Sequence, residues 1–134
     1  MSANTYQITP FMHVIDCAEA VRFLVDTLGF TAVVNQSGYA YLDREGAGLR
    51  VMGHKDAPNE IGSPHRGFAY YIDVQDVEVV LQQIGDKLAL LAEGHVRGPV
   101  DQPYGQRELM IRAPDGNLVV FGQAIDQQSQ GSLQ

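Results

Sequence analysis

The chain has 134 residues, of which 45% are hydrophobic and 19% are charged, and its formal net charge is −7. This length and composition suit one compact unit or two very small ones and exclude a disordered polymer, while the acidic balance argues against a nucleic-acid partner. No apolar run approaches the ~20 residues of a transmembrane helix, so no membrane partner is expected. Cys17 is the only cysteine, and the first residues show no basic and then apolar leader, so we expect a cytoplasmic protein.

The first half of the chain is predicted to form a β-α-β-β-β module over residues 6–54, preceded by an N-terminal extension, residues 1–5. The first strand falls within Thr5–Ile15, where both faces are largely apolar, so we expect it to be covered on both sides. The other strands of the module are expected at residues 30–35, 39–44 and 49–52, with glycine-containing turns between them.

A helix is expected between the first two strands of this module. Asp16 is a good N-cap, and Glu19 stands three residues further on, where it can complete a capping box. Gly29 ends the helix at the position just past its last turn, which favours glycine. Apolar residues at helical spacing give the helix one face to bury: Val21, Leu24, Val25 and Leu28.

A second β-α-β-β-β module is predicted over residues 67–124. A linker with prolines and glycine, residues 55–66, precedes it, and a flexible tail rich in Gln and Ser, residues 125–134, follows it. The position of the linker near the middle of the chain suggests an internal repeat.

The elements of the second module follow the order of the first. Asp76 caps a helix in which Gly85 costs about 1 kcal/mol relative to alanine, so we expect a bend or an early end there. The expected strands are residues 67–74, residues 94–100, Leu109–Ile111 and Leu118–Phe121. A Pro-Asp-Gly turn joins the last two strands into a hairpin.

The two halves align as two copies of one unit. The stretch Val14–Cys17 matches Val74–Val77 at an offset of 60 residues, and Arg50 matches Val120 at an offset of 70. Each copy is too small to bury its sheet alone, so the two should pack together. The predicted fold class is therefore α+β, with two tandem β-α-β-β-β modules that have cupped mixed sheets and helices outside.

These motifs resemble the vicinal oxygen chelate superfamily, which includes glyoxalases, extradiol dioxygenases, fosfomycin-resistance enzymes and bleomycin-resistance proteins. The resemblance covers about residues 6–123 and rests on Pro10–Asp16, Ala20, Phe23, Leu28–Phe30, Val74–Val77, Tyr104–Glu108 and Ala113–Asn117. It implies a homodimer, in which the modules pair within one chain or are exchanged between two. It does not fix the function, because one fold supports many activities.

The resemblance also implies where a metal would bind. Enzymes of this superfamily hold a divalent ion with His, Glu or Gln side chains, and these positions fall here on Thr9, Arg50, Ala69 and Val120. Alanine and valine have no donor atoms, and arginine stays cationic and repels the ion, so we expect no metal and no other cofactor. A shifted metal site made of His13, His54 and Asp73 is an alternative, because strand alternation puts them on the faces of the family positions.

Without a metal, the predicted site is a cavity for a small molecule. Strand alternation and the loop before the hairpin assign it Phe11, His13, Tyr39, Tyr41, Arg50, Met52, Tyr71, Asp73, Tyr104, Arg107, Glu108 and Val120. This set is aromatic and apolar with a few charges, which is typical of a ligand pocket. Two alternatives stay open: the side chains form an ordinary core, and Arg107 and Glu108 form a surface ion pair worth no more than ~1 kcal/mol.

The resemblance favours a metal-free protein of the bleomycin-resistance type that sequesters an aromatic compound, and the acidic charge weakly favours a cationic one. The chain has no Trp, so Tyr and Phe must provide the stacking surfaces. One alternative is a glyoxalase- or dioxygenase-like enzyme, with shifted metal ligands or with His13 or Asp73 as a base. Another is a protein whose pocket binds nothing and whose dimer surface matters.

Overall fold

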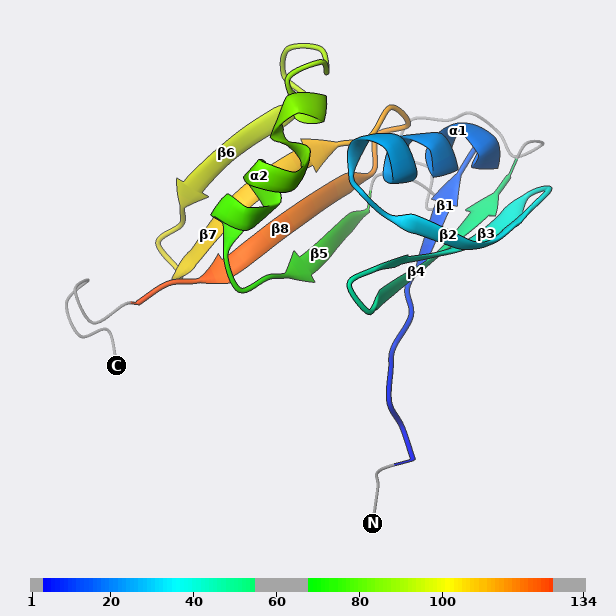
Figure 1. Cartoon of the computed structure of the whole chain (residues 1–134), viewed down its shortest axis with the longest axis horizontal. Coiled ribbons are helices and arrows are strands. Elements are labelled where there is room, and N and C mark those ends of the chain that lie inside the picture. The colour runs from blue at the N-terminus through cyan, green and yellow to red at the C-terminus, as the bar shows by residue number, and fades with distance from the viewer. Residues whose placement is uncertain (1–3, 55–67, 127–134) are drawn as a thin grey trace.

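Two four-stranded sheets, each accompanied by a helix, make up the fold (Figure 1). The computed structural model describes residues 4–54 and 68–126, so the predicted linker, 55–66, and most of the predicted tail lie outside the described residues. The first half contains β1 (Phe11–Val14), α1 (Cys17–Arg22), the π-helical turn η1 (Phe23–Thr27), β2 (Thr31–Gln36), β3 (Tyr39–Arg44) and β4 (Ala47–Gly53). The second half contains β5 (Ala69–Asp73), α2 (Val77–Leu88), β6 (Val96–Asp101), β7 (Gln106–Arg112) and β8 (Leu118–Ala124).

The two sheets have the same strand order and the same register. The orders are β1-β4-β3-β2 and β5-β8-β7-β6, with the first pair of each sheet parallel. Phe11 pairs with Arg50 in the first sheet, and Tyr71 pairs with Val120 in the second. These pairs are related by the offsets of 60 and 70 residues found in the sequence. The predicted α+β fold with two β-α-β-β-β modules is therefore confirmed, and Arg50 and Val120 occupy equivalent places.

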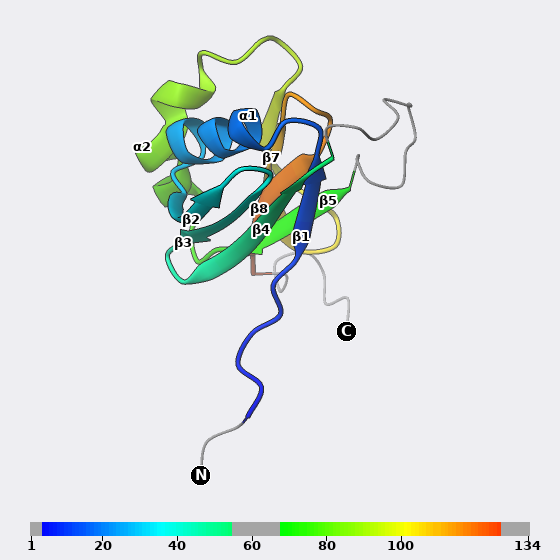
Figure 2. The same ribbon diagram turned by 90° about the vertical axis from the view of Figure 1, so that its right-hand side faces the viewer.

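The first strand is shorter than predicted and is covered on one face only. Residues 4–10 form an extended arm that leaves the body of the molecule, and Tyr6 on this arm is 93% exposed (Figures 1 and 2). Within β1, Met12 and Val14 are buried, whereas Phe11 is 45% exposed. The expected cover on both sides is wrong for the described chain, because no element packs on the second face.

Both helices begin at the predicted caps. The Asp16 side chain accepts a hydrogen bond from the backbone N–H of Glu19, and Asp76 accepts one from Glu78. Gly29, with a φ of 83°, follows the end of the first helix as expected. The expected early end at Gly85 is wrong, because α2 continues to Leu88. Burial of its apolar face outweighs the intrinsic cost of one glycine.

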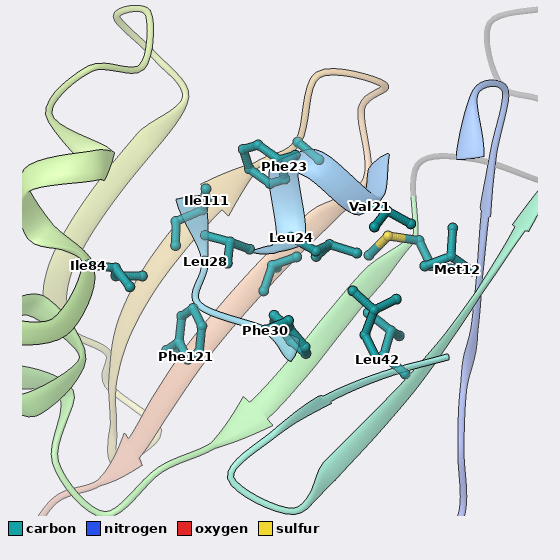
Figure 3. Packing of buried hydrophobic residues seen from close by; sticks show 14 of the residues in the cluster. Met12, Val21, Phe23, Leu24, Leu28, Phe30, Leu42, Ile84, Ile111 and Phe121 are labelled. Atoms are coloured by element: carbon teal, nitrogen blue, oxygen red, sulfur yellow. The ribbon is translucent and has the colours of Figure 1, made fainter. Parts of the chain in front are cut away.

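One hydrophobic core joins the two modules (Figure 3). Large side chains of the first module meet those of the second in it, among them Leu28, Phe30, Leu42, Ile84, Ile111 and Phe121. The modules of a single chain therefore pack on one another in this structure. In the described part of the chain, no helix has the length and apolarity needed to cross a membrane.

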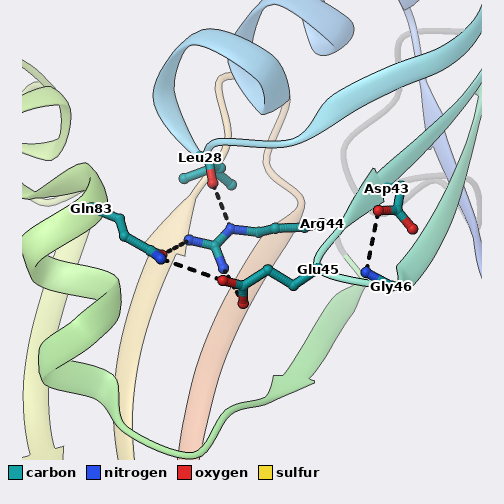
Figure 4. Close-up of polar contacts among 6 residues, drawn as sticks. All are labelled: Leu28, Asp43, Arg44, Glu45, Gly46 and Gln83. Carbon is teal, nitrogen blue, oxygen red and sulfur yellow. Dashed lines mark hydrogen bonds and ion pairs between the residues drawn. The ribbon is translucent and has the colours of Figure 1, made fainter.

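A buried guanidinium crosses the same junction (Figure 4). Arg44 is 7% exposed, and its Nε donates to the backbone oxygen of Leu28 at 2.9 Å. Its Nη2 donates to the Gln83 side chain on α2 at 2.7 Å, and its Cζ lies 5.0 Å from the centre of the Phe121 ring. Burial lowers the pKa of Arg44, which still stays charged. This side chain thus fixes the end of the first helix against the second module.

Candidate functional site

Each sheet buries one face in the core and leaves the other face open. Burial alternates along β3, where Ala40 and Leu42 are buried while Tyr39 and Tyr41 are half-buried. Along β5, Tyr71 is 43% exposed although it belongs to a strand next to the fully paired β8. The open faces carry most of the side chains that the sequence assigned to a cavity.

On the open face of the first sheet, a guanidinium is held between two tyrosines. Nη1 of Arg50 donates a hydrogen bond of 2.5 Å to the hydroxyl of Tyr39. Its Cζ lies 5.0 Å from the centre of the Tyr41 ring, which is a cation–π distance. Strand pairing sets this geometry, since Arg50 lies directly opposite Tyr41 in the antiparallel pair β3–β4.

Two histidines meet at the other end of this face. Nδ1 of His13 lies 2.6 Å from Nε2 of His54, and the ring centres are 4.8 Å apart. One ring must donate the proton of this hydrogen bond and the other must accept it. The Phe11 ring stacks on His13, with ring centres 6.2 Å apart. His13 therefore contacts both a second imidazole and an aromatic ring.

On the open face of the second sheet, a buried carboxylate receives three side-chain donors. Glu108 is 5% exposed and accepts hydrogen bonds from Tyr71 at 3.0 Å, from Tyr104 at 3.0 Å and from Gln102 at 3.1 Å. Within residues 4–54 and 68–126, no Lys, Arg or His lies within ion-pair distance of it. Burial of a carboxylate is costly unless it is hydrogen-bonded, and these donors meet that need.

The two tyrosines of this cluster donate hydrogen bonds to Glu108 and remain partly exposed to solvent. Tyr71 is 43% exposed and Tyr104 is 59% exposed. Burial of the hydroxyl, followed by the hydrogen bond to Glu108, raises the pKa of Tyr71 to about 12. The pKa of Tyr104 is raised by the same two causes. Both phenols are thus neutral hydrogen-bond donors at ordinary pH.

A cleft of about 650 Å³ adjoins this cluster. It runs between the N-terminal arm, the β3–β4 turn and β5, and Tyr6, Ile8, Tyr71 and Asp73 are among its lining residues. Its volume falls within the range of small-molecule sites. The cleft therefore joins the exposed Tyr71 ring to apolar side chains of the arm.

The structure defines the surroundings of three further predicted site residues. Arg107 does not pair with Glu108; its Nε donates to Asp101 at 2.6 Å, since neighbouring residues of β7 point to opposite faces. The alternative of an Arg107–Glu108 surface pair is therefore wrong. Val120 is only 5% exposed. Met52 is half-buried and pairs with both His13 and Tyr39.

Sequence reasoning missed three residues around Glu108. Gln102 donates to the carboxylate, and the side-chain amide of Gln106 lies 2.9 Å from the Tyr71 hydroxyl. Gly122 pairs with Glu108 and lies under the Tyr71 ring, so that any Cβ there would collide with the phenol. Alternation from Glu108 identifies Gln106, two residues earlier on the same strand. Gln102 and Gly122 depend on loop shape and strand register, which alternation does not give.

The donor set at the family metal positions does not fit a divalent ion. Arg50 is cationic there, and Ala69 and Val120 offer no donor atom. Thr9 lies in the arm and takes part in a hydrogen bond with Gln7. In the part of the chain that the structure describes, no three His, Cys, Asp or Glu side chains group as metal ligands, so Asp73 does not join His13 and His54.

The sequence has no match among curated proteins. The structure is similar to a bleomycin-binding protein from bleomycin-producing Streptomyces verticillus, complexed with copper(II)-bleomycin, with a TM-score of 0.71 and 22% identity over 93% of this chain and 100% of that one. A bleomycin resistance determinant encoded on the transposon Tn5 gives a TM-score of 0.71 and 21% identity over 90% and 98% of the two chains.

A third similar structure is an antibiotic-binding protein from Streptomyces sp. CB03234, with a TM-score of 0.66 and 22% identity over 92% of this chain and 99% of that one. At such identities these likenesses establish the fold and leave the ligand open. The family model for the glyoxalase/bleomycin resistance protein/dioxygenase superfamily matches residues 8–121. Because this match covers most of the chain and the duplicated module agrees with it, the chain belongs to the glyoxalase/bleomycin resistance protein/dioxygenase superfamily.

Proposed function

We propose that this chain is a metal-free small-molecule-binding protein of the bleomycin-resistance type, which sequesters an aromatic cation. The observation that carries the proposal is the cluster of Glu108 with Tyr71 and Tyr104. A buried carboxylate beside two exposed phenol rings offers a cation both charge and π-faces. The donor set at the family metal positions supports binding without a metal.

The same cluster explains selectivity by charge. The hydroxyl of each tyrosine donates a hydrogen bond to Glu108, so the ring is oriented before a ligand binds. Asp73, on the same edge strand as Tyr71, adds a second negative charge that acts on the Tyr71 phenol. A neutral aromatic molecule would gain only the contacts with the tyrosine rings. An aromatic cation would gain these contacts and also the electrostatic attraction of the carboxylates. The net charge of −7 also favours the encounter with a cation.

We further propose a cytoplasmic homodimer as the acting form. Tyr6 and Ile8 of the arm are 93% and 91% exposed, and Phe11 of β1 and Phe68, just before β5, are 45% and 48% exposed. Exposed large apolar side chains favour cover by another surface, and a second copy would supply one. Sedimentation velocity tests this: a dimer at micromolar concentration is expected, and a monomer at all concentrations would contradict it.

Isothermal titration with a matched pair of dyes tests the binding function. Aminoacridine is cationic at neutral pH, whereas acridine of the same ring system is largely neutral there. We expect the protein to bind aminoacridine at least about tenfold more tightly than acridine, as one charge-assisted contact implies. Bleomycin, the ligand of one similar structure, is titrated in parallel as a second probe.

Two variants give the test its control. Glu108→Gln keeps the shape of the side chain and removes its charge, so the preference for aminoacridine should fall about tenfold. Glu93→Gln removes one charge at an exposed position outside the cluster and should change affinity by less than about twofold. Absence of heat and of protection against melting with all three probes would overturn the proposal.

A second candidate function is an enzyme that uses acid–base chemistry. The contact between His13 and His54 favours it, because a pair of imidazoles can pass a proton at neutral pH. Metal analysis of protein purified without chelator tests the metal-dependent form of this candidate. Stoichiometric zinc, nickel, manganese or iron would favour a metalloenzyme, and less than about a tenth of an equivalent would leave metal-free acid–base chemistry and the binding protein, which a test for turnover in the presence of chelator separates.

A further inference from the structure

Arg50 is a cation on the open face of the first sheet, which points away from the core. Its strand, β4, is central in the first sheet, and the neighbouring side chains on this face are Phe11 from β1 and Tyr41 from β3. Leu49 and Val51, before and after it, are buried in the core, which directs the Arg50 side chain to the open face. The guanidinium is therefore placed by the pleat of the sheet.

Two tyrosines fix the orientation of this guanidinium. The hydroxyl of Tyr39 accepts a hydrogen bond from Nη1, and the ring of Tyr41 lies 5.0 Å from Cζ. The Tyr41 hydroxyl is itself held by the side chain of Gln7, at 3.2 Å. A long arginine side chain loses much conformational freedom when a ligand binds, and these contacts remove part of that cost beforehand.

Arg50 has no carboxylate at ion-pair distance within the described residues. The ion pairs of residues 4–54 and 68–126 join Arg44 to Glu45 and Arg107 to Asp101, and neither includes Arg50. A guanidinium has five N–H donors, and one hydrogen bond to protein, from Nη1 to Tyr39, is made among these residues. The remaining donors suit an oxyanion, which a guanidinium binds through two parallel hydrogen bonds.

We propose that Arg50, between Tyr39 and Tyr41, forms a subsite for an oxyanion carried by an aromatic ligand, such as a carboxylate or a sulfonate. The ring beside the anion would lie against Tyr41 and Phe11, which is 45% exposed. This subsite is separate from the Glu108 cluster and takes the opposite charge. The inference rests on the proposed small-molecule binding and specifies the chemistry of a second part of the ligand.

Two fluorescent probes that differ by one group test the subsite. Anilinonaphthalene sulfonate carries the oxyanion, and N-phenylnaphthylamine has the same rings without it. Arg50→Met should weaken sulfonate binding roughly tenfold to a hundredfold and change N-phenylnaphthylamine binding by less than about twofold, since only the charge-assisted contact is lost. The sulfonate affinity of Arg50→Lys should lie between those of the wild type and Arg50→Met, because lysine keeps the positive charge and lacks the paired N–H donors of the guanidinium.

Further variants distinguish a subsite from a packing role. Tyr39→Phe leaves the charge in place and removes one contact that orients it, so we expect a loss of about threefold for the sulfonate alone. Arg22→Met, at an exposed position on α1, is the matched control and should change nothing. Circular dichroism of each variant verifies that it is folded.

Each outcome decides between defined alternatives. Equal losses of both probes in Arg50→Met, an unchanged sulfonate affinity, or failure of the sulfonate to bind the wild type would overturn the subsite. If aminoacridine still binds through Glu108 in that case, the proposed function survives without this inference. Selective loss of the sulfonate would support the subsite even if aminoacridine does not bind, and only the cation preference would then fail.

Discussion

The hydroxyl of Tyr71 lies 3.0 Å from the carboxylate of Glu108, although this tyrosine is 43% exposed. The polar end and the apolar body of this side chain therefore have separate roles. The hydroxyl stabilises a buried anion, and the ring contributes to an open surface. The first two predictions below follow from this division.

Replacing Glu108 by glutamine should lower the pKa of Tyr71. Burial is the largest cause of the rise from 10.0 to about 12, and the hydrogen bond and charge of Glu108 follow it. In Glu108→Gln the charge is lost and the burial remains, so we expect a pKa between these two values. The phenolate absorbance titration of each protein, corrected with its Tyr71→Phe counterpart, measures it. An unchanged pKa would contradict the assigned geometry.

The same shift predicts how stability depends on alkaline pH. The folded protein holds the Tyr71 proton more tightly than the unfolded chain, whose tyrosines titrate near 10. The resulting stabilisation is fully present below about pH 10 and is lost as the pH rises through about 12. Urea unfolding of wild type and Tyr71→Phe across this range should show a steeper loss for the wild type. If the free energy of unfolding fell equally with pH in both proteins, the raised pKa of Tyr71 would be contradicted.

A methyl group at Gly122 should expel Tyr71 from Glu108. A Cβ at Gly122 would collide with the phenol, and the backbone there has an ordinary φ, so the ring is the group that must move. We expect Gly122→Ala to weaken aminoacridine binding about tenfold and to lower the pKa of Tyr71. Gly85→Ala, whose new Cβ meets no atom within 4 Å, serves as the control for binding. Wild-type affinity in Gly122→Ala would exclude the Tyr71 ring from the site.

Replacing Gly85 inside α2 and Gly29 just after the first helix by alanine should change the free energy of unfolding in opposite directions. Gly85 lies inside α2 with open space around it, so Gly85→Ala should raise the free energy of unfolding by about 0.5–1 kcal/mol. Gly29 has a φ of 83° and its Cβ would lie 3.4 Å from Ile84, so Gly29→Ala should lower it by about 1 kcal/mol or more. Urea denaturation of both variants measures these changes, and a shared sign would refute this reasoning.

Removal of the Arg44 guanidinium should destabilise the whole chain. Arg44→Met fills most of the volume but leaves the Leu28 oxygen and the Gln83 side chain without their donor, which should cost about 2–3 kcal/mol. Glu45→Gln is the matched control, since the Glu45 side chain is 65% exposed and its contact to Arg44 is 3.5 Å long. It should cost less than about 0.5 kcal/mol. A single unfolding transition for both is expected, because the modules share one core.

The fold could be predicted from the sequence because its determinants are local or repeated. Asp16 and Asp76 mark helix starts through bonds within three residues, and the offsets of 60 and 70 residues express a duplication that the strand register confirms. The length of β1 could not be read in this way. Thr5 to Pro10 have a pattern typical of a strand, but the pairing with β4 begins at Phe11, and Pro10 adds only the hydrogen bond that its oxygen accepts from the N–H of Arg50.

The arrangement of side chains was predictable only along each strand. Alternation correctly grouped Tyr39 and Tyr41 with Arg50 on one face, although their role in binding stays a prediction. Arg107 donates to Asp101 on the neighbouring strand. Arg44 donates to the backbone oxygen of Leu28 at the end of the first helix and to the side chain of Gln83 in the second module. Such contacts depend on how elements pack, and no spacing within the sequence encodes them.

The backbone of this molecule is nearly symmetric, and its electrostatics are not. Arg50 and Val120 hold the same place in the two sheets, so the duplication put a permanent cation in one copy and a hydrocarbon in the other. The second copy has its charge one strand further out, on Glu108, and of the opposite sign. Superposition of the two copies therefore matches their backbones and not their charges. The open faces of the two sheets present proposed ligand-binding groups of opposite charge on the same backbone framework.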